Sequence, residues 1–176
     1  MQSCIQEISR QPHSCVRRSL ANTYQTVSSA SVDVLWQVVV NLADVSWHPL
    51  LKSTNAPNGL TAKPGLIYKA FTARFPLPIR IFVERVDHRE LLSIRVYVLP
   101  GLEERVTYRI ESAVCGTQIS YSVTLRGWLS PLAWSLIRPH AAKVASALAI
   151  AAEQVARQAL AGPHPSSSRP SQDLLG

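Results

Sequence analysis

The sequence predicts an α+β domain in which an antiparallel sheet packs one face against a long C-terminal helix. Two patterns predict it: a run of five short apolar segments separated by Pro- and Gly-containing turns over residues 66–126, and then an Ala-rich segment with helical periodicity to about residue 161. With 176 residues, of which 47% are hydrophobic, the chain is long enough for one domain whose core needs no disulfides.

The first elements are expected to be a strand over Thr23–Ser29 and then a helix. Ser31 is placed to cap that helix, and Asp33 lies in its first turn, where a negative charge interacts favourably with the helix dipole. Pro49 cannot continue a helix and disfavours helical backbone at His48. We therefore expect two short helices between the first strand and Pro49.

The next segments have the alternation of half-buried strands. Val106, Tyr108 and Ile110 alternate with polar residues in one strand, and the following strand alternates in the same way around Tyr121 and Val123. One face of the sheet should therefore be apolar and the other should face water. We assign Glu84, Glu103, Glu104 and Glu111 to the face in water. The five strands are expected at residues 66–73, 79–86, 91–99, 105–112 and 118–126.

The last predicted element is a long helix that begins at Ser130 and Pro131. Pro139 lies inside it and cannot donate to the carbonyl of Ser135, so a kink or a break is expected there. Gly162 supplies a stop. The apolar stripe expected to face the sheet is Leu132, Leu136, His140, Val144, Leu148, Ala151 and Val155.

Composition divides the chain into three parts and restricts its partners. Residues 1–22 are expected to form a disordered arm, residues 23–161 the domain and residues 162–176 a disordered Pro/Ser-rich tail. The 18 Lys and Arg against 11 Asp and Glu are spread along the chain, which argues against nucleic acid as a partner and leaves weak attraction to an anionic membrane open. Three cysteines without a disulfide pattern and the lack of a secretory signal suggest a cytoplasmic location, with an organelle transit peptide conceivable.

Several classes of chemistry lack their motifs. The five histidines have no metal-ligand spacing, and no Cys pair accompanies them. A Gly-rich phosphate loop and a nucleophile elbow are also missing. We predict no metal and no cofactor.

The order of elements is that of the helix-grip fold, in which a curved sheet wraps around the last helix. The stretch "SVDVLWQVVVNLADVSWHPLL" resembles the first helices of the START-like, Bet v 1-type superfamily (SRPBCC), the polyketide cyclase/dehydrase and lipid transport group. In that superfamily a strand is followed by a helix with Val-Trp, then an Asp, a Trp-His-Pro segment and a Gly-led strand. This sequence matches them with Trp36, Asp44, Trp47-His48-Pro49 and Gly65. The resemblance spans residues 24–158.

This resemblance implies a deep apolar cavity between the sheet and the C-terminal helix, used in the superfamily for lipids, hormones, polyketides and quinones, sometimes with catalysis. In the Trp-His-Pro branch the Gly-led strand often carries an inward Arg. This chain has Tyr68 at about that position, so a catalytic role from that branch is not carried over.

The resulting hypothesis is a protein that binds a small hydrophobic ligand, such as a lipid, quinone, polyketide or isoprenoid, and carries or protects it. One alternative is a cyclase- or dehydratase-like enzyme, with His140 as the candidate catalytic residue and inward tyrosines beside it. Another is a ligand-free interaction module with a filled interior. Trp128, Leu129, Leu132 and Trp134, with Arg126 and Arg138, could touch an anionic membrane.

Two of the histidines have competing interpretations. His140 is either an acid–base group or a core or rim histidine satisfied by a hydroxyl. His48 either contacts ligand or only points to solvent or caps a carbonyl. The candidate ligand-binding residues are Trp36, Trp47, His48, Tyr68, Phe71, Tyr108, Tyr121, Trp134 and His140.

Overall fold

The computed structural model describes residues 19–72 and 77–161. The expected N-terminal arm up to residue 18 and the expected tail from residue 162 lie outside the described residues. In chain order the elements are β1 (Ser19–Ser28), α1 (Val32–Val40), β2 (Leu51–Thr54), β3 (Ile67–Thr72), β4 (Ile79–Asp87), β5 (Leu91–Leu99), β6 (Leu102–Ala113), β7 (Gly116–Gly127) and α2 (Ser130–Ala161).

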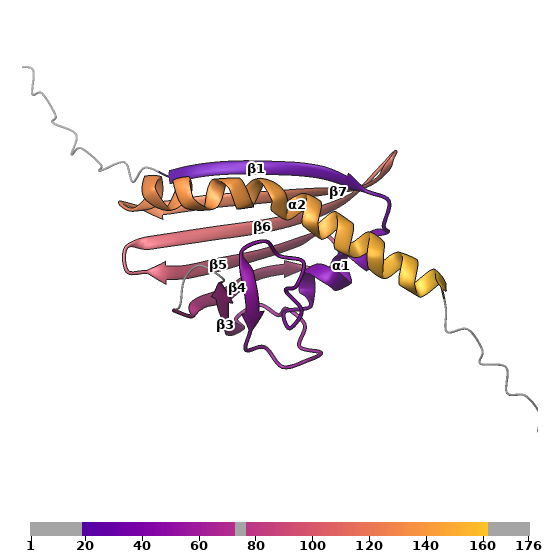
Figure 1. Ribbon diagram of the computed structural model, residues 1–176, viewed down its shortest axis with the longest axis horizontal. Helices are drawn as coiled ribbons and strands as arrows, with labels where there is room; N and C mark the ends of the chain where they lie inside the picture. The colour runs from indigo at the N-terminus through magenta and orange to yellow at the C-terminus, as the bar shows by residue number, and fades with distance from the viewer. Residues whose placement is uncertain (1–18, 73–76, 162–176) are drawn as a thin grey trace, which may run out of the picture.

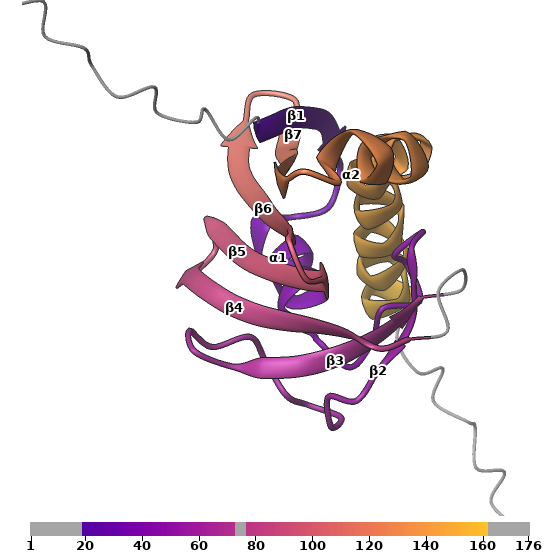
Figure 2. The same cartoon turned by 90° about the vertical axis from the view of Figure 1, so that its left-hand side faces the viewer.

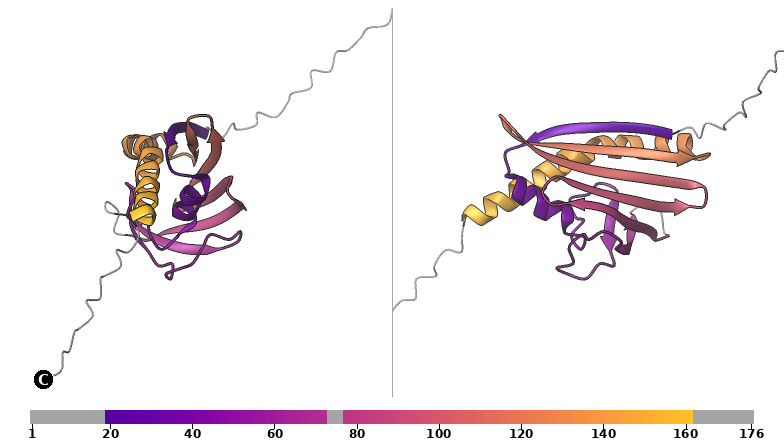
Figure 3. Two further views of the ribbon diagram at one scale, coloured as in Figure 1. Left: turned by 90° about the vertical axis from the view of Figure 1, so that its right-hand side faces the viewer. Right: turned by 180° about the vertical axis from the view of Figure 1, so that it is seen from behind.

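The strands form one antiparallel sheet with the order β1-β7-β6-β5-β4-β3-β2. The sheet curls, and both helices lie on its concave side, where α2 runs along β1 and β7 (Figures 1 and 2). Seen from behind, the convex face of the sheet carries no helix from the described part of the chain (Figure 3). The predicted α+β, helix-grip architecture is confirmed.

The register of the central strands confirms the predicted apolar face. Val106 pairs with Val123, and Tyr108 pairs with Tyr121 across β6 and β7. All four side chains are buried, because both strands point them toward α2 and the concave side. The alternation seen in the sequence therefore fixes which residues face the interior.

The segment after β1 differs from expectation, because a single short helix forms there. α1 ends at Val40, and Asn41 has extended backbone that bridges Thr61. The Asn41 side chain accepts from the N–H of Ala43 at 3.3 Å, and the Asp44 side chain accepts from the N–H of Ser46 at 3.1 Å. These short polar side chains take backbone donors that a second helix would need, so turns replace it.

Two strand boundaries also differ. β1 begins at Ser19, not at Thr23, because β7 continues to Arg126 and offers backbone partners along the whole length of β1. Residues 19–22, which were expected in the N-terminal arm, therefore belong to β1. β2 was not predicted, since its four residues are too few to show alternation, and it forms by pairing with β3.

A kink or a break was expected near Ser135, and α2 is continuous from Ser130 to Ala161 with an axis that bends along its length (Figure 1). The buried stripe is also rotated from the predicted one. Leu132 and Leu136 are 62% and 52% exposed. Small side chains let α2 approach β1 and β7 closely, which turns the alanine face inward. The buried residues of α2 are Ser130, Ala141, Val144, Ala145, Leu148, Ala149 and Ala152.

Candidate functional site

A cavity of about 540 Å³ lies between the concave face of the sheet, the segment after α1 and the first half of α2. Most of its lining side chains are Val, Leu or Ile. Leu99, Leu132 and Leu136 both line it and are exposed, so they mark its rim. An unfilled interior is the opposite of the filled core expected of an interaction module.

The rim continues into part of the predicted aromatic-basic cluster. Trp128 is 79% exposed in the turn before α2. Its indole packs beside the turn at Gly101, where a Cβ would meet the indole Nε1 at 2.9 Å. Arg126 and Arg138 are exposed as well. Contact between this cluster and a membrane stays a prediction.

Five titratable side chains line the cavity. His48 comes from the segment before β2, Tyr68 from β3, Glu104 and Tyr108 from β6, and Tyr121 from β7. They are brought together because all the sheet residues among them occupy inward positions on the concave face of one sheet. The site is therefore a mainly apolar cavity with a few convergent polar groups, as small-molecule sites are.

The register places Tyr68 and Glu104 in one row across the sheet. Tyr68 pairs with Ile81, Ile81 with Val96, and Val96 with Glu104. Leu125 follows on the other side of Glu104. The carboxylate thus lies between apolar neighbours on the inner face.

Glu104 corrects the prediction that it belongs to the face in water. Its side chain lines the cavity, and among the described residues no hydrogen-bond or ion-pair partner contacts it. Burial raises the pKa of Glu104 to about 7. The signal was present in the sequence: Glu104 is two positions before Val106, so strand alternation puts both on the same face.

Glu84 shows the opposite environment on the convex face. Burial opposes its ionisation, but hydrogen bonds and charge from Arg105 and Arg95 outweigh it and lower the pKa of Glu84. Arg105 Nε donates to Glu84 Oε2 at 2.7 Å, and Arg95 also pairs with it. Glu84 lies on the outer face, as predicted, and pairs there with Arg95 and Arg105.

The three tyrosines of the lining remain protonated. Burial raises the pKa of Tyr68, of Tyr108 and of Tyr121. The negative charge of Glu104 adds to this effect at Tyr108 and Tyr121. The rings of Tyr108 and Tyr121 lie with centroids 5.2 Å apart, so the two aromatic rings pack against each other in the cavity wall.

His48 lines the cavity and does not simply point to solvent. Its Nδ1 accepts a hydrogen bond from the N–H of Leu50 at 3.2 Å, which leaves the ring proton on Nε2. Burial lowers the pKa of His48 to about 4, so the ring is neutral at neutral pH. The ring centroid of Trp47 lies 5.2 Å away, and Trp47 in turn contacts Tyr108 at 6.2 Å.

Of the nine candidate ligand-binding residues, Trp47, His48, Tyr68, Tyr108 and Tyr121 line the cavity. Whether they bind a ligand stays a prediction.

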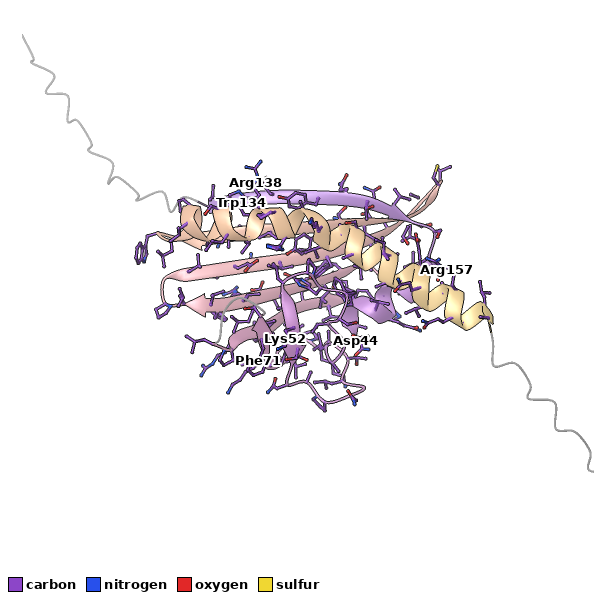
Figure 4. The ribbon with its side chains drawn as sticks, viewed as in Figure 1. Asp44, Lys52, Phe71, Trp134, Arg138 and Arg157 are labelled. Atoms are coloured by element: carbon purple, nitrogen blue, oxygen red, sulfur yellow. The ribbon has the colours of Figure 1, made fainter. Side chains whose placement is uncertain are left out.

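The other four lie elsewhere. Trp36 is buried in the core with its ring 5.8 Å from that of His88. Phe71 is 38% exposed on β3, across the molecule from Trp134 on α2 (Figure 4). His140 is half-buried and outside the lining, because the helix contribution ends at Ile137 and α2 then packs directly on the sheet.

None of the helices in the described part of the chain has the length and apolarity needed to span a membrane. No group of three or more His, Cys, Asp or Glu side chains there could hold a metal ion.

No family model matches this chain, and no curated protein sequence matches it. Solved structures do resemble it. Ara h 8.0201 has a TM-score of 0.60 at 14% identity, over 78% of this chain and 99% of that one. Norcoclaurine synthase from Thalictrum flavum has a TM-score of 0.59 at 17% identity, over 90% of this chain and 99% of that one.

A protein from Mesorhizobium loti, MLL2253, has a TM-score of 0.62 at 13% identity, over 77% of this chain and 98% of that one. At such identities the likeness concerns the fold alone. The curled seven-stranded sheet and the long C-terminal helix of this chain match the helix-grip arrangement of the Bet v 1-type fold. The chain therefore has the Bet v 1-type helix-grip fold.

Proposed function

We propose that this protein binds a small hydrophobic ligand in the cavity and carries or protects it. The observation that carries the proposal is an apolar cavity of about 540 Å³ between sheet and helix. Protein interiors are normally close-packed, and small-molecule sites fall in the range of roughly 300–1,000 Å³. A lipid, quinone, polyketide or isoprenoid would suit such a lining.

The exposed leucines support an entry route. Leu99, Leu132 and Leu136 combine solvent exposure with contact to the cavity, so an apolar ligand would meet apolar side chains as it enters. Ala133 lies on α2 just inside this rim and contributes little volume. A larger side chain at this position should block the cavity without changing the sheet.

The first test is to purify the protein gently, extract it with organic solvent and examine the extract by mass spectrometry. A fluorescent apolar dye then measures the cavity directly. We expect Ala133→Phe to weaken dye binding about tenfold or more, because the ring occupies ligand space. Ala142→Phe is the matched control, since Ala142 is exposed on the same helix and outside the lining.

Equal dye affinity in wild type, Ala133→Phe and Ala142→Phe would show that the dye binds elsewhere. An empty extract together with no dye binding by the wild type would contradict the proposed function itself. Circular dichroism of the three proteins checks that each keeps its fold.

A second candidate function is acid–base catalysis on the bound ligand. The observation in its favour is Glu104, whose pKa of about 7 suits a group that gives and takes a proton near neutral pH. His140 lies outside the lining, so Glu104 replaces it as the acid–base candidate. Incubating the extracted compound with fresh protein tests this: unaltered recovery of the compound argues for binding alone.

A further inference from the structure

Resting on the proposed function, we propose that the cavity selects hydrophobic ligands that carry an amine or other cationic group, which pairs with Glu104. A ligand of the same length that carries a carboxylate should be rejected. This deepens the binding proposal by naming the polar end of the ligand.

The first step of the argument is the isolation of the carboxylate. Glu104 lies on the inner face of β6 between Val96 and Leu125, and it lines the cavity. No Lys or Arg side chain of the described residues lines the cavity with it. An acid without a partner at such a place leaves a site that a ligand group can fill.

The second step is the charge of the remaining polar groups. His48, Tyr68, Tyr108 and Tyr121 are the other titratable side chains that face the cavity. The histidine is neutral above a pKa of about 4, and burial keeps the tyrosines protonated. Glu104 is therefore the lining group, among the described residues, that can carry charge at neutral pH.

The third step concerns the aromatic rings. Trp47, Tyr108 and Tyr121 form a continuous series of ring contacts along the cavity wall. Aromatic faces attract cations, and the attraction grows where water is excluded. A cation that enters the cavity would thus meet aromatic rings in the wall as well as the carboxylate of Glu104.

The fourth step is the fate of an acidic ligand. Its carboxylate would meet Glu104 and find no lining cation to receive it, so one of the two acids would have to bind a proton. A neutral alcohol is neither attracted nor repelled by the charge of Glu104, although its hydroxyl can donate a hydrogen bond to the carboxylate. The expected order of affinity is amine, then alcohol, then acid.

The experiment uses three probes with one chain length: decylamine, 1-decanol and decanoic acid. Each displaces an apolar fluorescent dye from the full-length protein at pH 8. We expect decylamine to bind about tenfold tighter than decanol, since a paired and partly buried charge contributes more than a neutral hydrogen bond. Decanoic acid should bind more weakly than decanol.

Glu104→Gln keeps the shape of the side chain and removes its charge. It should bring the affinities of decylamine and decanol within about twofold of each other, since only the charge pairing separates them. Glu103→Gln is the matched control. Glu103 is the neighbouring residue on the outer face, where it pairs with Arg95 Nε at 3.2 Å, so this variant should keep the wild-type order.

Wild-type protein gives a second measurement that needs no variant. Lowering the pH from 8 to 5.5 protonates Glu104, whereas decylamine stays cationic, so the preference for amine over alcohol should shrink about fivefold or more. A preference that is unchanged by pH and by Glu104→Gln would overturn this inference.

Binding of decanoic acid as tight as that of decylamine would overturn it too. In both cases dye and decanol would still bind, and the proposed function would stand. Failure of the dye and of all three probes to bind the wild type would instead overturn the proposed function, and this inference with it.

Discussion

Trp47 is held in the cavity wall by its ring and not by its indole N–H. The ring packs edge-on against His48 and Tyr108, while Nε1 is buried and has no hydrogen-bond partner among the described residues. An unpaired buried donor costs stability, so the stabilisation by Trp47 comes from the packing of its ring. Trp47 anchors the turn before Pro49 to the sheet.

This leads to a prediction for two variants of Trp47. Trp47→Ala should lower the free energy of unfolding by about 3 kcal/mol, because it removes packed ring volume. Trp47→Phe should cost less than about 1.5 kcal/mol, because it keeps an aromatic ring and removes the unpaired donor. Urea denaturation measures both. Equal losses for the two variants would mean that the indole N–H has a partner after all.

At the scale of elements, the end of β7 depends on a close backbone approach. Gly127 has φ +127°, and a Cβ there would lie 1.9 Å from the carbonyl oxygen of Gly101. Gly101 sits in the turn between β5 and β6 with φ +82°. These two glycines let the β5–β6 turn meet the end of β7, from which α2 starts.

We therefore expect Gly127→Ala to lower the free energy of unfolding by about 3 kcal/mol or more, since backbone must move as well as adopt an unfavourable φ. Gly59→Ala is the matched control. Gly59 also has a positive φ, of +81°, but nothing lies within 4 Å of a Cβ. It should cost about 1 kcal/mol, the backbone effect alone.

Thermal or urea unfolding of both glycine variants makes the comparison. Losses of the same size would show that the turn at Gly101 shifts easily and that only the backbone conformation matters. A larger loss for Gly127→Ala would establish the close approach as a structural requirement of the β7–α2 junction.

For the whole molecule, two groups of one cavity should influence stability in opposite directions. His48 has a folded pKa of about 4 against 6.5 in the unfolded chain, so its contribution is present above pH 6.5 and is lost as pH falls toward 4. Glu104 has a folded pKa of about 7 against 4.5, so its contribution is present below pH 4.5 and is lost as pH rises toward 7.

Each effect is at most about 3 kcal/mol, and the two nearly cancel between pH 4.5 and 6.5. His48→Gln should therefore become more stable as pH falls through this interval, and Glu104→Gln should become less stable. Urea denaturation at several pH values measures the three slopes. Parallel slopes for wild type and both variants would contradict the opposing titrations.

The Trp47-His48-Pro49 segment is part of the family resemblance and also predicts a turn, which the structure shows. The second helix predicted before Pro49 does not form, because the side chains of Asn41 and Asp44 accept hydrogen bonds from backbone N–H groups two residues later. Five of the nine candidate binding residues line the cavity. The prediction that Glu104 faces water is wrong, because strand alternation places its side chain on the inner face with that of Val106.

The sequence by itself determined the type and order of nearly all elements and the apolar face of the sheet. Caps, prolines and side-chain alternation act over a few residues, so they can be seen without a structure. Only the tertiary structure decided which inward side chains border empty space. That depends on how closely α2 approaches the sheet. After Pro139, the buried alanines of α2 let the helix pack closely on the sheet, whereas Leu132 and Leu136 before Pro139 stay exposed at the rim. The same long-range packing places Glu104, which was expected in water, in the cavity wall, where it is the only Asp or Glu of the described lining.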